Sequence, residues 1–446
     1  MTNTESNRPA IAIRPGGFVH DALTLATGAA LAQGLSFAIA PMLARLYSPQ
    51  DFGVFSIYVF VLGGAGAVVC WAYEAAVMLP KGDREGRDIV VLCIVIACTM
   101  AMLFVVPGFG ARPIARALHA PGLEPYLAWI SVNLLGLGVY QALSYWYNRT
   151  GEYRRMAYSR LIQSGVTGGG QVVCGLVAAG PGGLIAGQVL GQVAASGFLW
   201  RRALQQDSLD IREPLRADTL ARTLKRYRRF PLYTSWGTLL GTTALQVVPV
   251  LLSRQFGPAE AGLYFFGYRL LSSGVQLGTG SISQVLYQRA AAALNAGERV
   301  APLVEAVVVR VALGSAVVLG VFAAFAPGIF SLVFGPHWVR TGEYMRIVAP
   351  LFFMQMVASP VSITLFLFDK QLVASVVQIA LLSGSVGAIA FGGMLGASPG
   401  RTLSIYAAVQ ATIYFVYLVI VLRVVSASPR GLMHALAPGR WLWRRV

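Results

Sequence analysis

The feature that most constrains this chain is a succession of long apolar segments that fills most of its 446 residues. The sequence is 56% apolar and 12% charged, whereas soluble globular proteins carry roughly a quarter charged residues. Each segment is long enough to cross a hydrocarbon core of about 30 Å as a helix, which satisfies its own backbone hydrogen bonds in lipid. We therefore predict an all-α integral membrane protein with about 12 transmembrane helices, near 18–46, 53–79, 89–107, 125–147, 157–178, 182–200, 231–253, 261–288, 303–327, 344–368, 372–393 and 402–422.

The basic residues between these segments predict the orientation of the chain. If the N-terminus lies in the cytoplasm, 26 of the 35 Lys and Arg residues fall in cytoplasmic segments and 7 in segments on the other side. Cytoplasmic loops carry the excess of positive charge in membrane proteins, so we expect both termini in the cytoplasm. The same placement assigns the net charge of +17 to contacts with anionic membrane lipids and not to nucleic acid.

The sequence indicates neither a metal nor a cofactor. The four cysteines lie inside apolar segments without metal-ligand spacing, and the four histidines form no cluster. A Walker A loop is absent, so we do not expect the chain to hydrolyse nucleotide.

An internal repeat divides the chain into two related halves. The segment ARLYSPQDFGVF (44–55) recurs as SRQFGPAEAGLY (253–264), with matching Arg, Pro and Gly positions. Both copies are predicted at turns on the outer side, so the halves are related about an axis along the membrane normal. The repeat predicts that Arg45 and Arg254 face each other across the outer mouth of one lumen.

The repeat and the charge pattern together define the organisation of the chain. We expect a cytoplasmic N-terminal tail, a six-helix bundle, a basic cytoplasmic linker, a second six-helix bundle and a basic cytoplasmic tail, over 1–17, 18–200, 201–230, 231–425 and 426–446 respectively. Within the linker, Leu220, Leu224 and Tyr227 share one face of a helix that would lie on the membrane surface. A disordered basic linker is the alternative interpretation.

Five stretches of the sequence resemble the bacterial polysaccharide transporter family. They are ARLYSPQDFGVFSIY (44–58), WAYEAAVMLPKGDREG (71–86), FPLYTSWGTLLGTTALQVVPVLLSRQFGPAEAGLYFFGYRLL (230–271), SISQVLYQRAA (281–291) and LVFGPHWVRTGEYMRIVAPLFF (332–353). This family of O-antigen and exopolysaccharide flippases belongs with the MATE-type extruders and the peptidoglycan lipid flippase in one superfamily, known as MOP. The resemblance implies a MATE-like fold of two pseudo-symmetric six-helix bundles around a central lumen.

The resemblance also implies a function. Such a protein flips an undecaprenyl-pyrophosphate-linked oligosaccharide from the cytoplasmic to the periplasmic leaflet of the bacterial inner membrane, for surface polysaccharide synthesis. A polysaccharide polymerase and co-polymerase are candidate partners, and we expect a monomer. A MATE-like drug or small-metabolite antiporter is the alternative. An integral-membrane enzyme would be expected to show a large periplasmic loop, and none is predicted.

Arg269 is the leading candidate for substrate binding. It lies about nine residues into the segment 261–288, or roughly 13 Å deep at 1.5 Å per residue. A charge at that depth is expected to face a bundle interior or a water-filled cavity. A guanidinium suits a pyrophosphate because it is planar and permanently charged. The helical face of Arg269 continues through Gln276, which we expect to contact glycan. The alternative is a polar helix interface in which a carboxylate pairs with Arg269.

Three further arginines are candidates for the same role. Arg310 lies within a predicted span, while Arg149 and Arg160 flank the inner loop between the fourth and fifth spans. They would receive the pyrophosphate at the inner mouth. The alternative is that they extend to lipid headgroups.

Five residues are candidates for coupling or gating. Glu74 lies near the inner end of the second span, where it would exchange a proton or a Na⁺ ion, or pair with Arg149 or Arg160. At the two outer turns we expect the pairs Arg45–Asp51 and Arg254–Glu260 to help close the lumen. Charges that stabilise helix termini are the alternative for these pairs.

Overall fold

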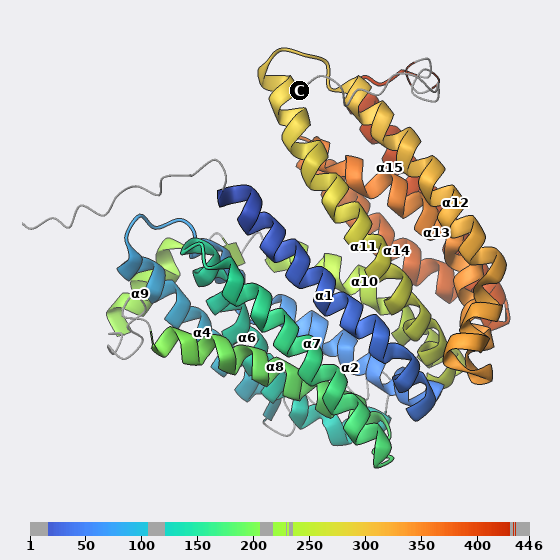
Figure 1. The fold of residues 1–446 in the computed structure, drawn as a ribbon, viewed down its shortest axis with the longest axis horizontal. Helices are drawn as coiled ribbons and strands as arrows, with labels where there is room; N and C mark the ends of the chain where they lie inside the picture. Colours follow the sequence, from blue (N-terminus) through green and yellow to red (C-terminus); the bar gives the residue numbers. More distant parts are fainter. Residues whose placement is uncertain are drawn as a thin grey trace, which may run out of the picture.

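The structure, a computed structural model, describes residues 17–105, 121–205, 217–228, 230–231, 235–428, 431 and 433. These residues form helices arranged as two bundles, drawn from blue to green and from yellow to red in Figure 1. The expected N-terminal tail and most of the C-terminal tail lie outside the described residues.

Each predicted apolar segment corresponds to a long helix within the described ranges. The first bundle contains α1 (Gly17–Leu46), α2 (Pro49–Ala67), α4 (Asp83–Val105), α6 (Leu127–Arg149), α7 (Tyr153–Leu176) and α8 (Pro181–Leu204). The second contains α10 (Ser235–Phe256), α11 (Pro258–Asn295), α12 (Ala301–Phe334), α13 (Val339–Ser362), α14 (Gln371–Met394) and α15 (Pro399–Val424). Short elements lie between them: α3 (Tyr73–Ala76), α9 (Ala217–Arg226), and the 3-10 helices η1 (Pro121–Tyr126), η3 (Pro336–Trp338) and η4 (Ile363–Phe366).

The helices differ in how well they suit lipid. Nine of those in the described ranges are long and apolar enough to cross a membrane, or ten if the bent helix α10 counts as one span. The two remaining long helices are α7 and α11. Both carry arginine and glutamine within their length, which is expected of helices that face a polar interior rather than lipid.

The second predicted span is interrupted. We expected one helix over 53–79, but α2 ends at Ala67 and a separate turn, α3, follows at Tyr73. Between them Trp71 and Ala72 have φ values of 49° and 57°, in the left-handed region that non-glycine residues rarely adopt. The prediction of a continuous helix was wrong because apolar composition alone does not show a break in the backbone.

The repeat holds the two bundles together at one end. A Cβ atom on Gly53 would collide with the carbonyl group of Pro258, and a Cβ on Gly262 would collide with that of Pro49. The same two positions of each copy therefore make reciprocal contacts between α2 and α11, as a pseudo-twofold relation requires. Figure 1 shows the bundles joined at this end, where α1 leads into α2, and diverging towards the loop between α11 and α12.

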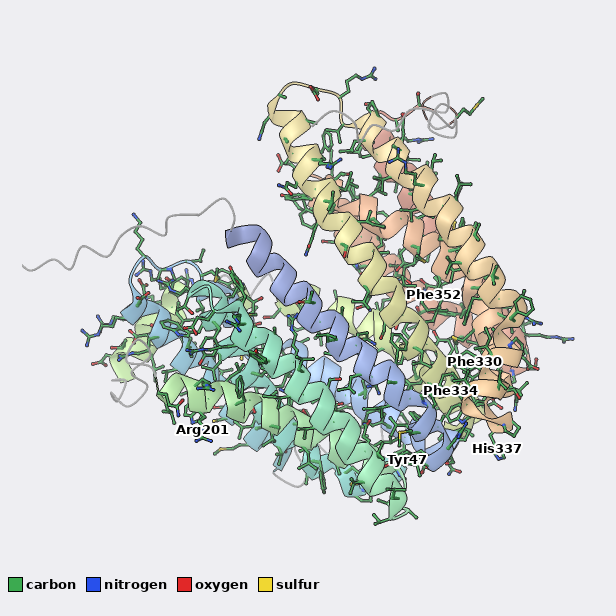
Figure 2. All side chains as sticks on the ribbon, viewed as in Figure 1. Tyr47, Arg201, Phe330, Phe334, His337 and Phe352 are labelled. Atoms are coloured by element: carbon green, nitrogen blue, oxygen red, sulfur yellow. The ribbon has the colours of Figure 1, made fainter. Side chains whose placement is uncertain are left out.

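Aromatic rings fill the rest of the joined end. The ring of Phe52 lies 5.0 Å from that of Phe266 and 5.4 Å from that of Trp338, centroid to centroid. The indole nitrogen of Trp338 donates a 2.8 Å hydrogen bond to the carbonyl of Ala44, across the bundle boundary. Figure 2 labels Tyr47 and His337 at this end, with Arg201 far from it at the opposite end of the first bundle.

The linker helix α9 packs on the first bundle. Tyr227, just after α9, is buried and donates a 3.0 Å hydrogen bond to Glu85 of α4, and Arg226 forms a 2.7 Å ion pair with the same carboxylate. Burial and the neighbouring carboxylate raise the pKa of Tyr227 above its usual range. The backbone carbonyl of Leu224 accepts a 3.2 Å hydrogen bond from Tyr73. The apolar face that we assigned to the membrane surface is thus partly covered by protein, because the bundle end offers a carboxylate and a tyrosine to it.

Candidate functional site

A cavity of about 490 Å³ lies between the two bundles. Its walls come mainly from α1 and α7 of the first bundle and from α11 of the second, with single residues from α2, α6 and α8. None of its lining residues within the described part of the chain is Asp or Glu. The polar ones are Gln33, Ser36, Tyr140, Arg160, Gln163, Ser164, Thr167, Gln171, Gln188, Arg269 and Ser273.

Arg269 projects from α11 into this cavity. Its guanidinium carbon lies 5.9 Å from the centre of the Phe55 ring, an aromatic contact available to a cation. No Asp or Glu of the described residues pairs with it. The alternative of a carboxylate-paired helix interface therefore does not describe Arg269 in this structure.

Arg160 of α7 lines the same cavity from the other bundle. Its side chain is half-buried, and it makes no ion pair with a described carboxylate. Two permanent positive charges that line one cavity from different bundles create a positive potential within it. An anion that enters between the bundles would be stabilised by both guanidinium groups.

The amide groups around the arginines divide into two sets. Some hold helices together: Gln163 donates a 2.7 Å hydrogen bond to Gln192, and Gln171 donates one of 3.0 Å to the carbonyl of Leu184. Gln33 and Gln188 make no hydrogen bond to other residues that the structure describes. Their amides remain available to hydroxyl or acetamido groups of a ligand.

Arg149 has a structural position outside the cavity. Its guanidinium donates to the carbonyls of Val77 and Pro80, at 2.9 and 2.6 Å, and pairs with Asp83 at 3.3 Å. These contacts fasten the connection between α3 and α4 to the end of α6. The structure therefore contradicts a direct contact of Arg149 with substrate in the cavity, because its donors serve the loop.

Arg310 also lies away from the cavity. It is exposed on α12, on the same helical face as Leu313, Val317 and Val321, which are 55%, 67% and 57% exposed. That face is apolar and turned outwards, so lipid is its natural neighbour. Of the two expected roles, the contact with lipid headgroups fits the position and the contact with substrate does not.

Gln276 is exposed on α11, two turns beyond Arg269, and is not part of the cavity wall. Ser273, on an adjacent face of the same helix, is the residue that lines the cavity instead. The face of α11 that lines the cavity thus differs by one residue from the predicted face, because Leu270 and Ser273 are turned towards the first bundle and Ser272 and Gln276 are not.

Glu74 lies in α3 and does not line the cavity. Its Oε2 atom is buried and has no hydrogen-bond partner among the described residues. The two expected partners are committed elsewhere, since Arg149 pairs with Asp83 and Arg160 lines the cavity. Glu74 is therefore a largely buried carboxyl group without an ion-pair partner among the described residues.

The charges at the outer turns make different pairs from those predicted. Asp51 accepts hydrogen bonds from the backbone and hydroxyl of Ser48 in a capping box at the start of α2. Glu260 pairs with Arg340 at 2.7 Å and accepts a hydrogen bond from Tyr344, both on α13. The predicted pairs Arg45–Asp51 and Arg254–Glu260 were wrong, because Arg45 and Arg254 are exposed and nearer groups take both carboxylates.

A family model described as polysaccharide biosynthesis protein matches residues 42–343, about two thirds of the chain. The chain belongs to this family. No curated protein sequence matches it.

Solved structures show the fold of this family member. It is similar to the lipid II flippase MurJ in an inward closed conformation, with a TM-score of 0.72 and 12% identity over 93% of this chain and 90% of that one. It is also similar to a multidrug resistance MATE family transporter of the MOP superfamily in an inward-facing conformation, with a TM-score of 0.67 and 14% identity over 91% and 96%. The protein is thus a multi-pass membrane protein with the fold of MOP-superfamily transporters, as the sequence predicted.

A third solved structure also shares the fold. For a MATE family transporter of the MOP superfamily in an outward-facing conformation the TM-score is 0.52, at 14% identity over 93% of this chain and 95% of that one.

Apart from Gln33, one of several glutamines within the apolar segments, the cavity residues of α1 were not predicted from the sequence. Ala29, Ala32, Gln33, Ser36 and Ala40 recur at steps of one to four and line the cavity. This stripe of small and polar residues within an apolar segment is a signal that could have identified the cavity wall. We overlooked it because α1 carries no charge in this stretch.

Proposed function

We propose that this protein flips an undecaprenyl-pyrophosphate-linked oligosaccharide across the inner membrane, from the cytoplasmic to the periplasmic leaflet. The observation that carries the proposal is one cavity, without a lining carboxylate, into which the two bundles direct Arg160 and Arg269. An anionic headgroup matches this pair in charge. The membership in the polysaccharide biosynthesis family supports a glycan as the remainder of the substrate.

The cavity fits part of such a substrate. At about 490 Å³ it lies within the range of roughly 300–1,000 Å³ typical of ligand sites. The pyrophosphate and the adjacent sugar would occupy it, with Gln33 and Gln188 facing the sugar hydroxyls. The polyprenyl tail would remain in lipid, where it needs no polar partner.

Alternating access is the transport step that follows from this arrangement. The bundles diverge from the end where Gly53 and Gly262 hold them together, so substrate enters on the diverging side. We place that side in the cytoplasm, with both termini, on the distribution of basic residues. Release would require the joined end to open, while the protein works as a monomer beside the polymerase and co-polymerase.

The MATE-like antiporter alternative fits the cavity less well. Organic cations need carboxylates to offset their charge, and this lining offers two guanidinium groups in their place. A cationic drug would meet repulsion from both walls.

Ion coupling through Glu74 is the second part of the proposal. The unpartnered Oε2 of Glu74 is the feature that motivates it, since such a group can take up a proton or a Na⁺ ion. In proteoliposomes we expect flipping to depend on an imposed H⁺ or Na⁺ gradient and Glu74→Gln to remove that dependence. Flipping that ignores both gradients would exclude coupling but leave the substrate assignment intact.

The decisive test replaces the cavity arginines in a strain that depends on this protein for surface polysaccharide. We expect Arg269→Ala and Arg160→Ala to reach the membrane at normal levels and to abolish export, because the anion loses one of its two positive contacts. Arg269→Lys tests whether charge alone suffices.

Arg310→Ala is the matched control, since it removes an exposed arginine that does not line the cavity. Export should continue in this variant. Normal export from a well-expressed Arg269→Ala protein would remove the proposed role of the cavity.

A further inference from the structure

A second polar cluster lies outside the cavity, at the break after α2. The chain leaves α2 at Ala67, turns through Trp71 and Ala72, and enters α3. This turn carries Cys70 and Glu74 and packs against α4, which carries Cys93. The cavity is lined by none of these three side chains, and only Glu74 enters the proposed function, as the candidate for ion coupling.

The three side chains converge on one point. The Sγ atoms of Cys70 and Cys93 and a carboxylate oxygen of Glu74 all lie within 4.8 Å of one another. Both thiols are free and almost fully buried, at 1% and 0% exposure. They belong to segments 23 residues apart, so the tertiary fold, and not the sequence spacing, brings them together.

The cluster is incompletely satisfied without a ligand. Glu74 Oε2 is buried and accepts no hydrogen bond from the described residues. The Cys70 thiol makes weak sulfur hydrogen bonds, of 3.8 and 3.6 Å, to the carbonyls of Cys93 and Gly138, and lies next to the Cys93 thiol. Burying a carboxylate oxygen without a partner is unfavourable, so a cation at this point would stabilise the cluster.

The donor atoms select the class of cation. The two thiols, as thiolates, are soft ligands that favour Zn²⁺ and related ions, and Zn²⁺ also accepts a carboxylate oxygen. Mg²⁺ and Ca²⁺ prefer sites built from oxygen alone. Three protein ligands and one water complete a four-coordinate geometry. Binding converts both thiols to thiolates and releases their two protons to water.

We propose that Cys70, Glu74 and Cys93 bind one soft divalent cation of the zinc class. The cation ties the turn after α2 to α4, and so fixes the segment that also contacts the linker helix through Tyr73. This inference does not depend on the transported substrate, but a cation held by Glu74 would exclude the ion coupling proposed for that residue. It replaces the expectation, drawn from cysteine spacing, that the chain has no metal site.

The test uses the full-length protein, purified in detergent under reducing conditions and titrated with Co²⁺ as a spectroscopic substitute for Zn²⁺. We expect one Co²⁺ per chain, with sulfur-to-metal charge-transfer absorption that Zn²⁺ abolishes by displacement. Cys70→Ser and Cys93→Ser should each lose this absorption. Loss of a residue that only supports a metal ligand weakens binding by roughly 10- to 100-fold. Glu74→Gln removes a ligand itself, so we expect it to weaken Co²⁺ binding by more than that.

The control is Cys98→Ser combined with Cys174→Ser, which removes the two free cysteines outside the cluster. This variant should bind Co²⁺ like the natural protein. Size-exclusion profiles show whether each variant is folded. If the serine variants are not folded, the Co²⁺ affinity of Glu74→Gln tests the proposal. Absence of the absorption in the natural protein, its persistence in folded Cys70→Ser, or unchanged affinity in Glu74→Gln would each overturn the proposal.

Discussion

Two regions of the molecule use the same helix, α11, in opposite ways. At the joined end, Gly262 lets the backbone of α11 touch that of α2, and Phe266 packs against Phe52 and Trp338. Seven residues after Gly262, about two turns along, Arg269 enters a polar cavity with no ion-pair partner among the described residues. The two bundles are thus in close contact at Gly262 and separated by a cavity at Arg269.

The difference separates groups that stabilise the fold from groups that wait for a ligand. Three polar groups of the joined end have partners: Trp338 donates to Ala44, Thr341 donates to Leu263, and Glu260 pairs with Arg340. In the cavity neither guanidinium group has an ion-pair or hydrogen-bond partner among the described residues, so both are free to bind an anion. Substitutions in the two regions should therefore affect stability and transport in opposite proportion.

The largest expected effect comes from Gly262→Leu at the joined end. A Cβ there would collide with the carbonyl of Pro49, so α2 and α11 must separate, at a cost of about 3 kcal/mol or more. Spin labels can be placed at the exposed positions 45 and 254 in a protein whose Cys98 and Cys174 are replaced by serine. Double electron–electron resonance should then report a longer distance between the labels in Gly262→Leu than in the parent protein.

Gly278→Ala is the matched control for this substitution. It also adds a side chain to α11, but at a position with open space around the new Cβ. Its label distances should match those of the parent protein. An unchanged distance in folded Gly262→Leu would show that the reciprocal glycine contact does not hold the bundles together.

Trp338→Phe should have a smaller effect at the same end. It keeps an aromatic ring but leaves the carbonyl of Ala44 without its 2.8 Å hydrogen bond, which destabilises by about 1 kcal/mol. The thermal unfolding midpoint in detergent should fall. Trp236→Phe, at a tryptophan that is 58% exposed, provides the comparison and should leave the midpoint unchanged. Equal midpoints for the two variants would contradict the role of this hydrogen bond.

Arg340→Gln should change stability by less than about 1 kcal/mol. The pair with Glu260 is short, at 2.7 Å, but the arginine side chain is 54% exposed and solvent screens the interaction. A double-mutant cycle with Glu260→Gln measures the coupling, which should shrink as salt is added. A coupling of several kcal/mol that is insensitive to salt would contradict this, and would mean that the ion pair is a main source of stability at the joined end.

Arg269→Leu should cost no stability at all, although it removes a partly buried charge from the cavity. The guanidinium has no ion-pair partner to lose among the described residues, and an apolar side chain is easier to bury. Its unfolding midpoint should equal or exceed that of the parent protein while export is lost.

Arg346→Leu is the contrasting variant. Arg346 donates 2.9 and 3.0 Å hydrogen bonds to the carbonyls of Ala323 and Ala324. The carbonyl of Ala323 has no backbone donor within α12, because Pro327, four residues later, lacks an N–H group. This variant should lower the midpoint. If Arg269→Leu lowered it equally, the cavity arginine would be structural and the comparison between the two regions would fail.

The sequence predicted the fold well because its signals are additive along the chain. Apolar length identified the helices, and the matching of Gly53 with Gly262 identified the two halves. The break after Ala67 was missed, since hydropathy is blind to backbone dihedrals. For the site, Arg160 and Arg269 were both among the candidates, but so were Arg149 and Arg310, and nothing in the sequence separates a guanidinium with partners from one without.

The amino-acid sequence by itself determined that this protein is a bundle of membrane-crossing helices in two related halves, because lipid admits few other solutions for such apolar segments. Tertiary structure alone decided which polar groups meet. Arg160 and Arg269 line one cavity, whereas Arg149 binds a loop and Arg310 lies on an exposed apolar face. Cys70, Glu74 and Cys93 lie together only in the folded protein. These outcomes depend on the rotation of each helix about its axis, which is set by packing between helices distant in the sequence.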